Sequence, residues 1–548
     1  MYFYYDAHFG GNMPEVIIVG AGLAGMSAAT RLMEQGFDIA LYEQNDFLGG
    51  KLGAYRLSGK PDPHEHCYHM YLNWYNNFWK LMREIGALDK FEASPIIGCR
   101  LKGDTETRRY LINAGAPATT LANMFNGIVP PAEYFLWAYS LLDLIGTQSM
   151  SEDILEQTSV QNFFRSRSYS TDASIENCSR TLAEAFAAPS YLSSARSYQS
   201  LIKYGYPNPV PSLWLLTENT NDAIFEPWAK HLEARAKQLK RRFKIHRRAR
   251  LEQLHLKDGK VSKLTFGRMP CEPATDRGVV PPTSKTWEID VPDDLILTVP
   301  PQALARLVSW EVAACSPNLE TVRLLRSEPM ISLDIYFNRE IKGLNSSITL
   351  LLNSKYTLSL LDNSKVWKDL PKDRTALNVI ASNADLIVDY PNEVILDILL
   401  KELQHFLDFK LDLAPDRSLR QDDVDYKRCH VQTNVGEALF VNQVGSWASR
   451  PSATCDIPNL FLAGDFCQTF IDVVTIEGAV VSGLVAAEAL RSRRGIGAPI
   501  EVIRPDSYPA FIPALLSMAL RPAAQLAQAV SVLDSTVRTQ FSRVFPNG

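Results

Sequence analysis

The stretch from Val16 to Glu43 constrains the fold of this chain more than any other part of the sequence. An apolar run, Val-Ile-Ile-Val, leads directly into Gly-Ala-Gly-Leu-Ala-Gly, and a second apolar run follows one helix length later and ends at Glu43. This spacing predicts a βαβ unit in which a glycine-rich turn joins the first strand to the helix. The chain should therefore contain a Rossmann-like α/β domain.

Each residue of this pattern has its own expected task. Gly20 permits the tight turn, Gly22 lets the backbone approach a pyrophosphate, and Gly25 lets the helix pack closely on the strand. The phosphates would lie at the helix N-terminus, where unpaired N–H groups favour an anion. Glu43 lies eighteen positions after Gly25, which suits a carboxylate that binds the adenosine ribose. Three glycines can also be plain turn residues, but the strands, helix and acidic residue in register favour a dinucleotide site.

Two further segments favour FAD over NAD as the dinucleotide. Gly49-Gly50-Lys51 follows the second strand, where adjacent glycines expose backbone N–H groups and the lysine can neutralise a phosphate. Far downstream, an apolar strand ends in Gly464-Asp465, and Glu477-Gly478-Ala479 opens a long apolar helix. A lone glycine pair would be a plain turn. Together, the segments predict one extended FAD held by distant parts of the chain.

These segments resemble the flavin-containing amine oxidase superfamily, and within it the plant and cyanobacterial phytoene and zeta-carotene desaturases. The resemblance covers most of the chain. It rests on the glycine blocks and on Glu65–His69, the helix-like segment 76–86, Asp294–Pro301 and the two blocks around Gly464 and Glu477. It implies an α/β fold: a Rossmann-like FAD-binding domain of the GR2-type flavoprotein fold, with an inserted mixed substrate domain and a helical cap.

The resemblance also implies roles for the downstream residues. In such enzymes the Gly-Asp carboxylate lies by the ribityl-phosphate part of FAD, which assigns that role to Asp465. The Glu-Gly-Ala helix presents its positive N-terminus to the flavin ring, where it stabilises negative charge. The expected FAD contacts are Gly20, Gly22, Ala24, Gly25, Glu43, Gly49, Gly50, Lys51, Leu251, Gly464, Asp465, Glu477, Gly478 and Ala479.

The segment after the Gly-Gly-Lys block supplies the candidate catalytic residues, because the resembled family returns it toward the flavin. His66 or His69 could donate to the substrate or polarise the flavin, and Tyr68 could shape the pocket. Packing of these rings in a buried loop is the alternative. The family usually has glycine and a long aliphatic or Phe residue where Cys67 and Tyr68 stand. The resemblance therefore does not carry the identity of the substrate.

Four functions are compatible with this site. The leading hypothesis is a desaturase or dehydrogenase that removes hydride to flavin N5 from a long apolar, polyprenoid or carotenoid-like substrate. The alternatives are a redox-neutral isomerase or dehydroxylase of a polyene or isoprenoid lipid, an amine or amino-acid oxidase, and a non-catalytic flavin-binding scaffold. The complete set of phosphate loops argues against the scaffold. Oxygen, a quinone and a second enzyme remain open as electron acceptors.

Composition fits a large enzyme of this class. A chain of 548 residues is expected to form about two or three domains. Its net charge of −5 gives no overall electrostatic attraction to nucleic acid. The eight cysteines show no CxxC pair or metal-ligand spacing, so we expect reduced thiols in a cytoplasmic protein and no metal site. The sequence shows no recognisable secretory signal and no apolar run long enough to span a membrane.

The FAD-binding domain is expected to be discontinuous and to comprise residues 14–71, 225–301 and 445–492. Residues 72–224 predict a mainly helical cap and substrate region, and residues 302–444 a sheet-plus-helix substrate domain. Residues 493–548 predict a helical tail. Within it, the apolar stretch Phe511–Leu520 either packs on the body or makes a peripheral membrane contact. The oligomeric state is left open.

Overall fold

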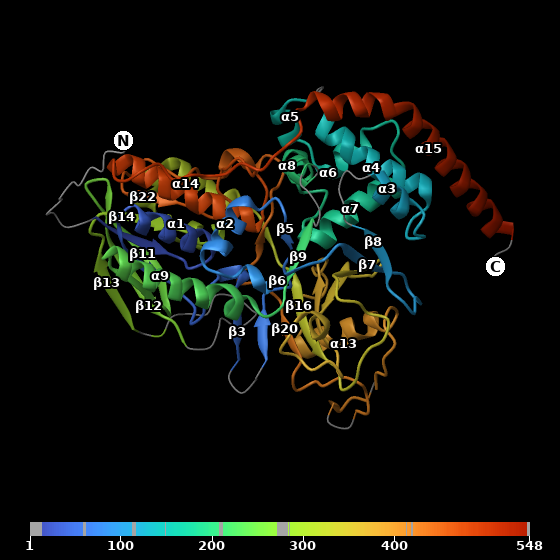
Figure 1. Ribbon diagram of the computed structural model, residues 1–548, viewed down its shortest axis with the longest axis horizontal. Helices are drawn as coiled ribbons and strands as arrows, with labels where there is room; N and C mark the ends of the chain where they lie inside the picture. The colour runs from blue at the N-terminus through green and yellow to red at the C-terminus, as the bar shows by residue number, and fades with distance from the viewer. Residues whose placement is uncertain are drawn as a thin grey trace.

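The computed structural model has two lobes, with a long C-terminal helix running along and beyond the second (Figure 1). The first lobe holds a parallel sheet covered by helices, and the second holds another sheet beneath a layer of helices. The structure describes residues 14–544 except 58–61, 112–116, 148–149, 206, 208–211, 271–282, 284, 413 and 418–419.

A five-stranded parallel sheet forms the centre of the first lobe. Its strand order is β10 (Phe243–His246), β2 (Asp38–Tyr42), β1 (Glu15–Val19), β14 (Asp294–Leu297) and β22 (Leu460–Leu462). All four pairings are parallel. Neighbouring strands therefore come from distant parts of the chain. This arrangement confirms the predicted α/β, Rossmann-like fold class.

Both faces of this sheet are covered, which explains why its strands are continuous apolar runs. Val16 and Ile18 pack toward the helices α1 (Leu23–Glu34), α9 (Glu226–Leu239) and α14 (Ile476–Arg494). The alternating residues Ile17 and Val19 pack toward an antiparallel sheet on the other face. That sheet consists of β11 (Ala249–Lys257), β12 (Lys260–Arg268) and β13 (Thr286–Asp290).

The second lobe is built on a seven-stranded sheet that is antiparallel except between β17 and β7. Helix α13 (Asn392–Leu403) packs on one face of it. The strand order is β20 (His430–Gln432), β16 (Ile331–Tyr336), β19 (Ala376–Ala381), β18 (Leu358–Asp362), β17 (Thr349–Leu351), β7 (Ile96–Arg100) and β8 (Arg108–Leu111). Strands β7 and β8 come from the region for which the sequence indicated mainly helices.

Six helices form the layer above this sheet (Figure 1). They are α3 (Pro117–Met124), α4 (Pro131–Gly146), α5 (Glu152–Glu156), α6 (Val160–Arg165), α7 (Asp172–Phe186) and α8 (Ala195–Gly205). The tail forms one long helix, α15 (Phe511–Val544), which contains Pro522 and packs against α4. No helix in the described part of the chain is both long and apolar enough to cross a bilayer.

Shorter elements connect the layers and carry residues that are used below. They are β3 (Ala54–Arg56), β4 (Pro63–Glu65), β5 (Tyr71–Leu72), α2 (Asn76–Glu84), β6 (Phe91–Ala93), β9 (Leu213–Leu216), α10 (Pro301–Leu307), α11 (Trp310–Cys315), β15 (Ser327–Glu328), α12 (Asn363–Val366) and β21 (Leu439–Phe440).

Candidate active site

A cavity of about 490 Å³ opens at the carboxyl ends of the parallel strands and extends toward the second lobe. Ligands of open α/β sheets bind at this edge. Most of the residues predicted from the sequence lie on its wall. They are Gly20, Gly22, Ala24, Glu43, Gly49, Gly50, Lys51, His66, Tyr68, His69, Leu251, Gly464, Asp465 and Ala479. Gly25, Glu477 and Gly478 do not line it.

Two glycine loops face each other in this cavity. Gly49 N donates to the carbonyl oxygen of Ala21 at 2.9 Å, which fixes the second loop against the first. A Cβ at Gly22 would lie 3.7 Å from Gly49 O and 4.0 Å from Gly50 Cα. It would therefore occupy the gap between the loops without striking protein. The gap is a cradle of backbone that fits a pyrophosphate.

Gly25 serves a different purpose from Gly22. A Cβ there would lie 1.9 Å from Gly20 O, which no small adjustment relieves. The close approach of α1 to the turn therefore requires glycine, in agreement with the packing role expected for this position. Gly25 therefore packs against the turn at Gly20 and does not line the cavity itself.

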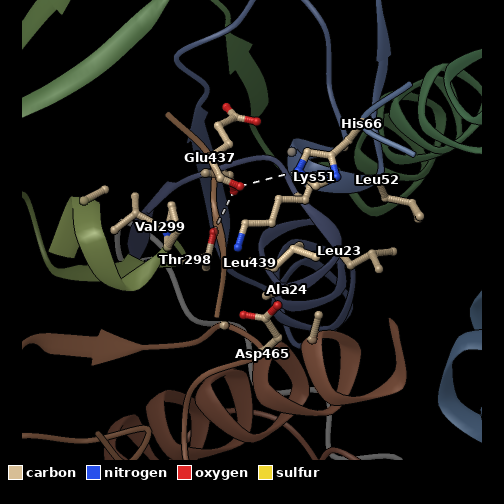
Figure 2. Close-up of a pocket in the computed structure, with 18 of the residues that line it drawn as sticks. Leu23, Ala24, Lys51, Leu52, His66, Thr298, Val299, Glu437, Leu439 and Asp465 are labelled. Carbon is tan, nitrogen blue, oxygen red and sulfur yellow. Dashed lines mark hydrogen bonds between the residues drawn. The ribbon is translucent and has the colours of Figure 1, made fainter. Parts of the chain in front are cut away.

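Lys51 places a positive charge in the same cavity. Its Nζ is buried and has no hydrogen-bond partner among the described residues. Figure 2 shows the side chain reaching across the cavity between Glu437 and Asp465. Desolvation raises the pKa of Glu437, and the nearby Lys51 opposes that shift. Because an unpaired buried ammonium is costly, the site fits a ligand that brings negative charge to Lys51, as a phosphate does.

Two backbone donors hold the carboxylate of Glu43 in place. Its carboxylate accepts hydrogen bonds from Ala21 N at 2.8 Å and from Asn45 N at 2.9 Å. Burial raises the pKa of this carboxyl to about 7, although both hydrogen bonds favour the charged form. Each oxygen keeps capacity for a further donor. The geometry suits two ribose hydroxyls.

The structure shows what the side chain of Glu477 binds. Its buried carboxylate accepts hydrogen bonds from Asn77 N at 2.9 Å, Asn77 Nδ2 at 2.7 Å and Phe78 N at 3.0 Å. These donors belong to the first turn of α2, so the carboxylate of Glu477 connects α14 to α2, and Glu477 does not line the cavity. The sequence pattern places Glu477 at a helix start, but only the tertiary structure shows which helix its carboxylate serves.

The N-terminus of α14 still reaches the cavity through its neighbours. Thr475 caps the helix by accepting a hydrogen bond from Gly478 N at 3.0 Å, so Gly478 contributes backbone to the cap. Thr475, Ile476 and Ala479 line the cavity. The N-terminal turn of α14, which carries the positive end of the helix dipole, therefore borders the cavity.

The three candidate catalytic residues all lie on the cavity wall. His66 Nε2 lies 3.4 Å from the carbonyl oxygen of Glu437. Since a carbonyl only accepts, this contact places the proton of a neutral His66 on Nε2 and leaves a lone pair on Nδ1. Nδ1 has no partner among the described residues. Tyr68 is fixed by donating from its hydroxyl to Ser359 Oγ at 2.6 Å.

Both histidines are neutral near pH 7. Burial lowers the pKa of His66 to about 3, with Lys51 adding to the shift, and burial lowers the pKa of His69 to about 4. His69 Nε2 lies 3.6 Å from Cys67 Sγ. A neutral imidazole can accept a proton or donate a hydrogen bond, but it does not supply the positive charge of an imidazolium.

The depressed pKa of His66 predicts how the cofactor-free protein responds to acid. The unfolded chain protonates His66 near pH 6.5, whereas the folded chain does not, so the stability due to neutral His66 is present above pH 6.5 and declines as pH falls. Between pH 6.5 and 5.5 the loss should be about 1 kcal/mol. We expect His66→Gln to lose less stability than wild type over this interval, measured by urea unfolding. Parallel pH profiles for the two proteins would contradict this prediction.

The cavity also contains residues that sequence reasoning missed. Thr298 directly follows β14 and donates from Oγ1 to the carbonyl oxygens of Val19 and Gly20 at 3.0 and 2.9 Å. Its place after a buried parallel strand was an available signal. Glu437 lies in an irregular segment before β21 and carried no sequence signal. The apolar part of the wall includes Met70, Leu72, Ala187, Met330, Ile380 and Leu439.

Known proteins share this sequence pattern and fold. The chloroplastic or chromoplastic 15-cis-phytoene desaturase of Solanum lycopersicum is 24% identical over 493 residues, which cover 87% of this chain and 77% of the relative. The 15-cis-phytoene desaturase of Synechococcus elongatus is 24% identical over 489 residues, which cover 87% and 96% of the two chains.

Solved structures show the same fold at lower identity. Cyclohexylamine oxidase from Brevibacterium oxydans superposes with a TM-score of 0.59 at 15% identity, covering 88% of this chain and 100% of the other. Putrescine oxidase bound to putrescine gives 0.59 at 16%, covering 88% and 99%.

The family model described as flavin containing amine oxidoreductase matches residues 23–491. That range contains most of the cavity wall and most of both lobes. The chain therefore belongs to the flavin-containing amine oxidoreductase family, and it is an FAD-dependent oxidoreductase.

Proposed function

We propose that this protein is a desaturase or dehydrogenase of a long apolar substrate of the polyprenoid or carotenoid type. The observation that carries the proposal is the apolar part of the cavity. Met330 and Ile380 belong to a buried apolar cluster on one face of the second sheet, and Met70, Leu72 and Leu439 pack against that cluster. An apolar chain gains free energy by leaving water for such a wall.

The distribution of charge on the wall supports the same substrate class. The acidic residues on the wall are Glu43, Glu252, Glu437 and Asp465. Glu43 is held by the glycine turn, Glu252 pairs with Arg250, and Glu437 lies beside Lys51. These three carboxylates are engaged at or near the region that we assign to the cofactor. An amine substrate would instead need an anionic partner for its ammonium group.

FAD, when bound, supplies the acceptor for the hydride that leaves a substrate C–H bond. The chain itself must then remove one proton from the adjacent carbon to complete the double bond. That proton is strongly acidic because the substrate has just lost a hydride, so a weak base suffices. We assign this proton to His66 Nδ1, whose lone pair has no partner in the described part of the chain. Tyr68 and the apolar wall exclude water and orient the chain.

The relatives support the substrate class. Two of them are named 15-cis-phytoene desaturases and align with most of this chain. A polyene or its more saturated precursor is therefore the first substrate to try. Residues of this chain that depart from the family pattern, Cys67 and Tyr68, lie on the same wall and are expected to tune which polyene fits.

The test is anaerobic reduction of the bound flavin. We expect a 15-cis-phytoene suspension to bleach the flavin absorption and to yield a product with one or more additional conjugated double bonds. A changed isomer without bleaching would indicate a redox-neutral isomerase. Bleaching by amines but not by the polyene would indicate an amine oxidase. Either result would overturn the proposal.

Variants of the two histidines test the proton assignment. We expect His66→Ala to lower kcat by about 100-fold, within the usual range for loss of a general base, with unchanged flavin content. His69→Ala should have a smaller effect because its Nε2 contacts Cys67. The control is His255→Ala, since His255 lies on β11 outside the cavity wall and contacts Thr265. Full turnover by His66→Ala would show that the His66 ring only packs in the cavity wall and does not take up the proton.

A further inference from the structure

An irregular loop joins β22 to α14 along one side of the cavity. We call residues 464–475 the β22–α14 loop. Asp465 and Phe466 near its start line the cavity, and so do Val474 and Thr475 at its end. In Figure 2 the side chain of Asp465 points into the cavity. The loop contains no helix or strand, so its conformation depends on contacts with other segments.

A buried arginine outside the cavity wall makes several of these contacts. Arg450 is 3% exposed and does not line the cavity. Its Nε donates to the carbonyl oxygen of Phe466 at 2.8 Å, and its Nη2 donates to that of Cys467 at 3.0 Å. Its Nη1 donates to Asp472 Oδ1 at 2.5 Å. One guanidinium therefore joins the start of the β22–α14 loop to a residue three positions before Thr475.

Asp472 has a backbone conformation that needs such support. Its φ is +50°, in the left-handed region that residues other than Gly, Asn and Asp seldom adopt. On the side of α8, Asp472 Oδ2 lies 3.2 Å from Arg196 Nε, and Ser197 Oγ donates to Asp472 Oδ1 at 3.4 Å. Burial raises the pKa of Asp472, and Arg450 and Arg196 oppose that shift. The carboxylate is thus held between Arg450 and α8.

Stability alone does not account for this ion pair. Desolvation of two buried charges offsets much of their attraction, so a buried pair is weak evidence for a stabilising role. An arginine adds geometry instead, because its planar fork of donors holds several acceptors in one arrangement. The three acceptors of Arg450 all lie on the β22–α14 loop. Arg450 therefore determines where the cavity-lining residues of that loop stand.

We propose that Arg450 is a positioning residue for the flavin cofactor and acts through Asp472 and the β22–α14 loop. It sets the place of Asp465 and of the N-terminal turn of α14 relative to bound FAD. A helix N-terminus favours negative charge, and charge near the flavin ring tunes its electronics. Because a flavin gains electrons on reduction, displacing this turn should weaken the binding of reduced FAD more than that of oxidised FAD. The proposal does not depend on the identity of the substrate.

The experiment compares the affinities of the full chain for oxidised and reduced FAD. Quenching of flavin fluorescence gives the Kd of oxidised FAD, and the midpoint potential of the bound flavin gives the relative affinity for reduced FAD. We expect Arg450→Met to weaken the binding of oxidised FAD about 10-fold and of reduced FAD about 100-fold. The tenfold difference lowers the midpoint potential by about 30 mV for a two-electron couple.

Asp472→Asn tests the ion pair with less risk to the fold. Asparagine tolerates a left-handed backbone, and Arg450 keeps its hydrogen bonds to Phe466 and Cys467. We expect this variant to lower the midpoint potential by a smaller amount. Because the two residues act as a unit, the double variant should bind FAD no more weakly than Arg450→Met alone.

Arg31→Met is the matched control. Arg31 is also a buried arginine with two ion pairs, but its partners Glu34 and Glu84 lie on α1 and α2. This variant should lower Tm without changing the ratio of the affinities for the two redox states. An unchanged ratio in Arg450→Met would overturn the proposal, as would an equal change in Arg31→Met. If Arg450→Met does not fold, an unchanged ratio in Asp472→Asn overturns it alone.

Discussion

Replacing Gly22 with valine is expected to abolish high-affinity FAD binding while leaving the protein folded. The backbone at Gly22 has φ −78° and ψ −174°, an extended conformation that valine adopts readily. Its Cβ would meet protein only at ordinary contact distances. The side chain would instead fill the gap between the glycine loops. Loss of about two charge-assisted hydrogen bonds to phosphate costs roughly 3–5 kcal/mol, which corresponds to at least about a 100-fold weaker Kd.

The measurement is titration of the cofactor-free variant with FAD, followed by quenching of flavin fluorescence, with thermal unfolding recorded in parallel. Gly25→Ala is the contrasting variant, because its Cβ would lie 1.9 Å from Gly20 O. That variant should lower Tm strongly or fail to fold, since it separates α1 from the turn. If Gly22→Val bound FAD as tightly as wild type, the gap between the loops would not be the pyrophosphate site.

Replacing Glu477 with alanine is expected to destabilise the fold strongly. The substitution removes a carboxylate that accepts three hydrogen bonds from Asn77 and Phe78. It leaves buried donors unsatisfied and also creates a void, so we expect a loss of about 3–5 kcal/mol in the free energy of unfolding. Urea unfolding of the cofactor-free protein measures this loss directly.

Glu501→Ala is the control for that prediction. Glu501 also bonds to α2, through Lys80 Nζ at 2.8 Å, but its side chain is 68% exposed. An exposed ion pair contributes little, so the control should unfold at the wild-type temperature. Equal Tm values for Glu477→Ala and wild type would show that α2 does not depend on this carboxylate. A variant that remained stable but bound FAD poorly would restore Glu477 to the cofactor site.

The first lobe could be predicted from the sequence because local chemistry determines it. A fully buried parallel strand must be apolar along its whole length, and the turn after β1 needs glycines for steric reasons that operate within a few residues. Gly22, Gly49 and Lys51 could therefore be placed together before their distance was known. The same reasoning extended to Asp465, because a strand that ends at a ligand-binding edge is recognisable wherever it occurs in the chain.

Other parts of the site depend on contacts between distant segments, which one sequence does not reveal. β7 is a five-residue strand whose parallel partner β17 lies about 250 residues later, so no local periodicity indicated the sheet. Glu477 carries a local signal for a helix start, but α2 supplies its partners. The low pKa values of His66 and His69 result from burial, which is a property of the assembled cavity.

The strand order of the first lobe determines when the cofactor site comes into existence during synthesis. β1 cannot pair with β14, nor β14 with β22, until the later strand has been synthesised. β22 is translated about 440 residues after β1. At roughly 5–20 residues per second, that interval lasts about 20–90 s. During this time the glycine loops are present but the wall formed by Asp465 and the start of α14 is not. We therefore expect FAD to bind only after translation is nearly finished, and a chain truncated before β22 to lack the wall formed by Asp465 and the start of α14.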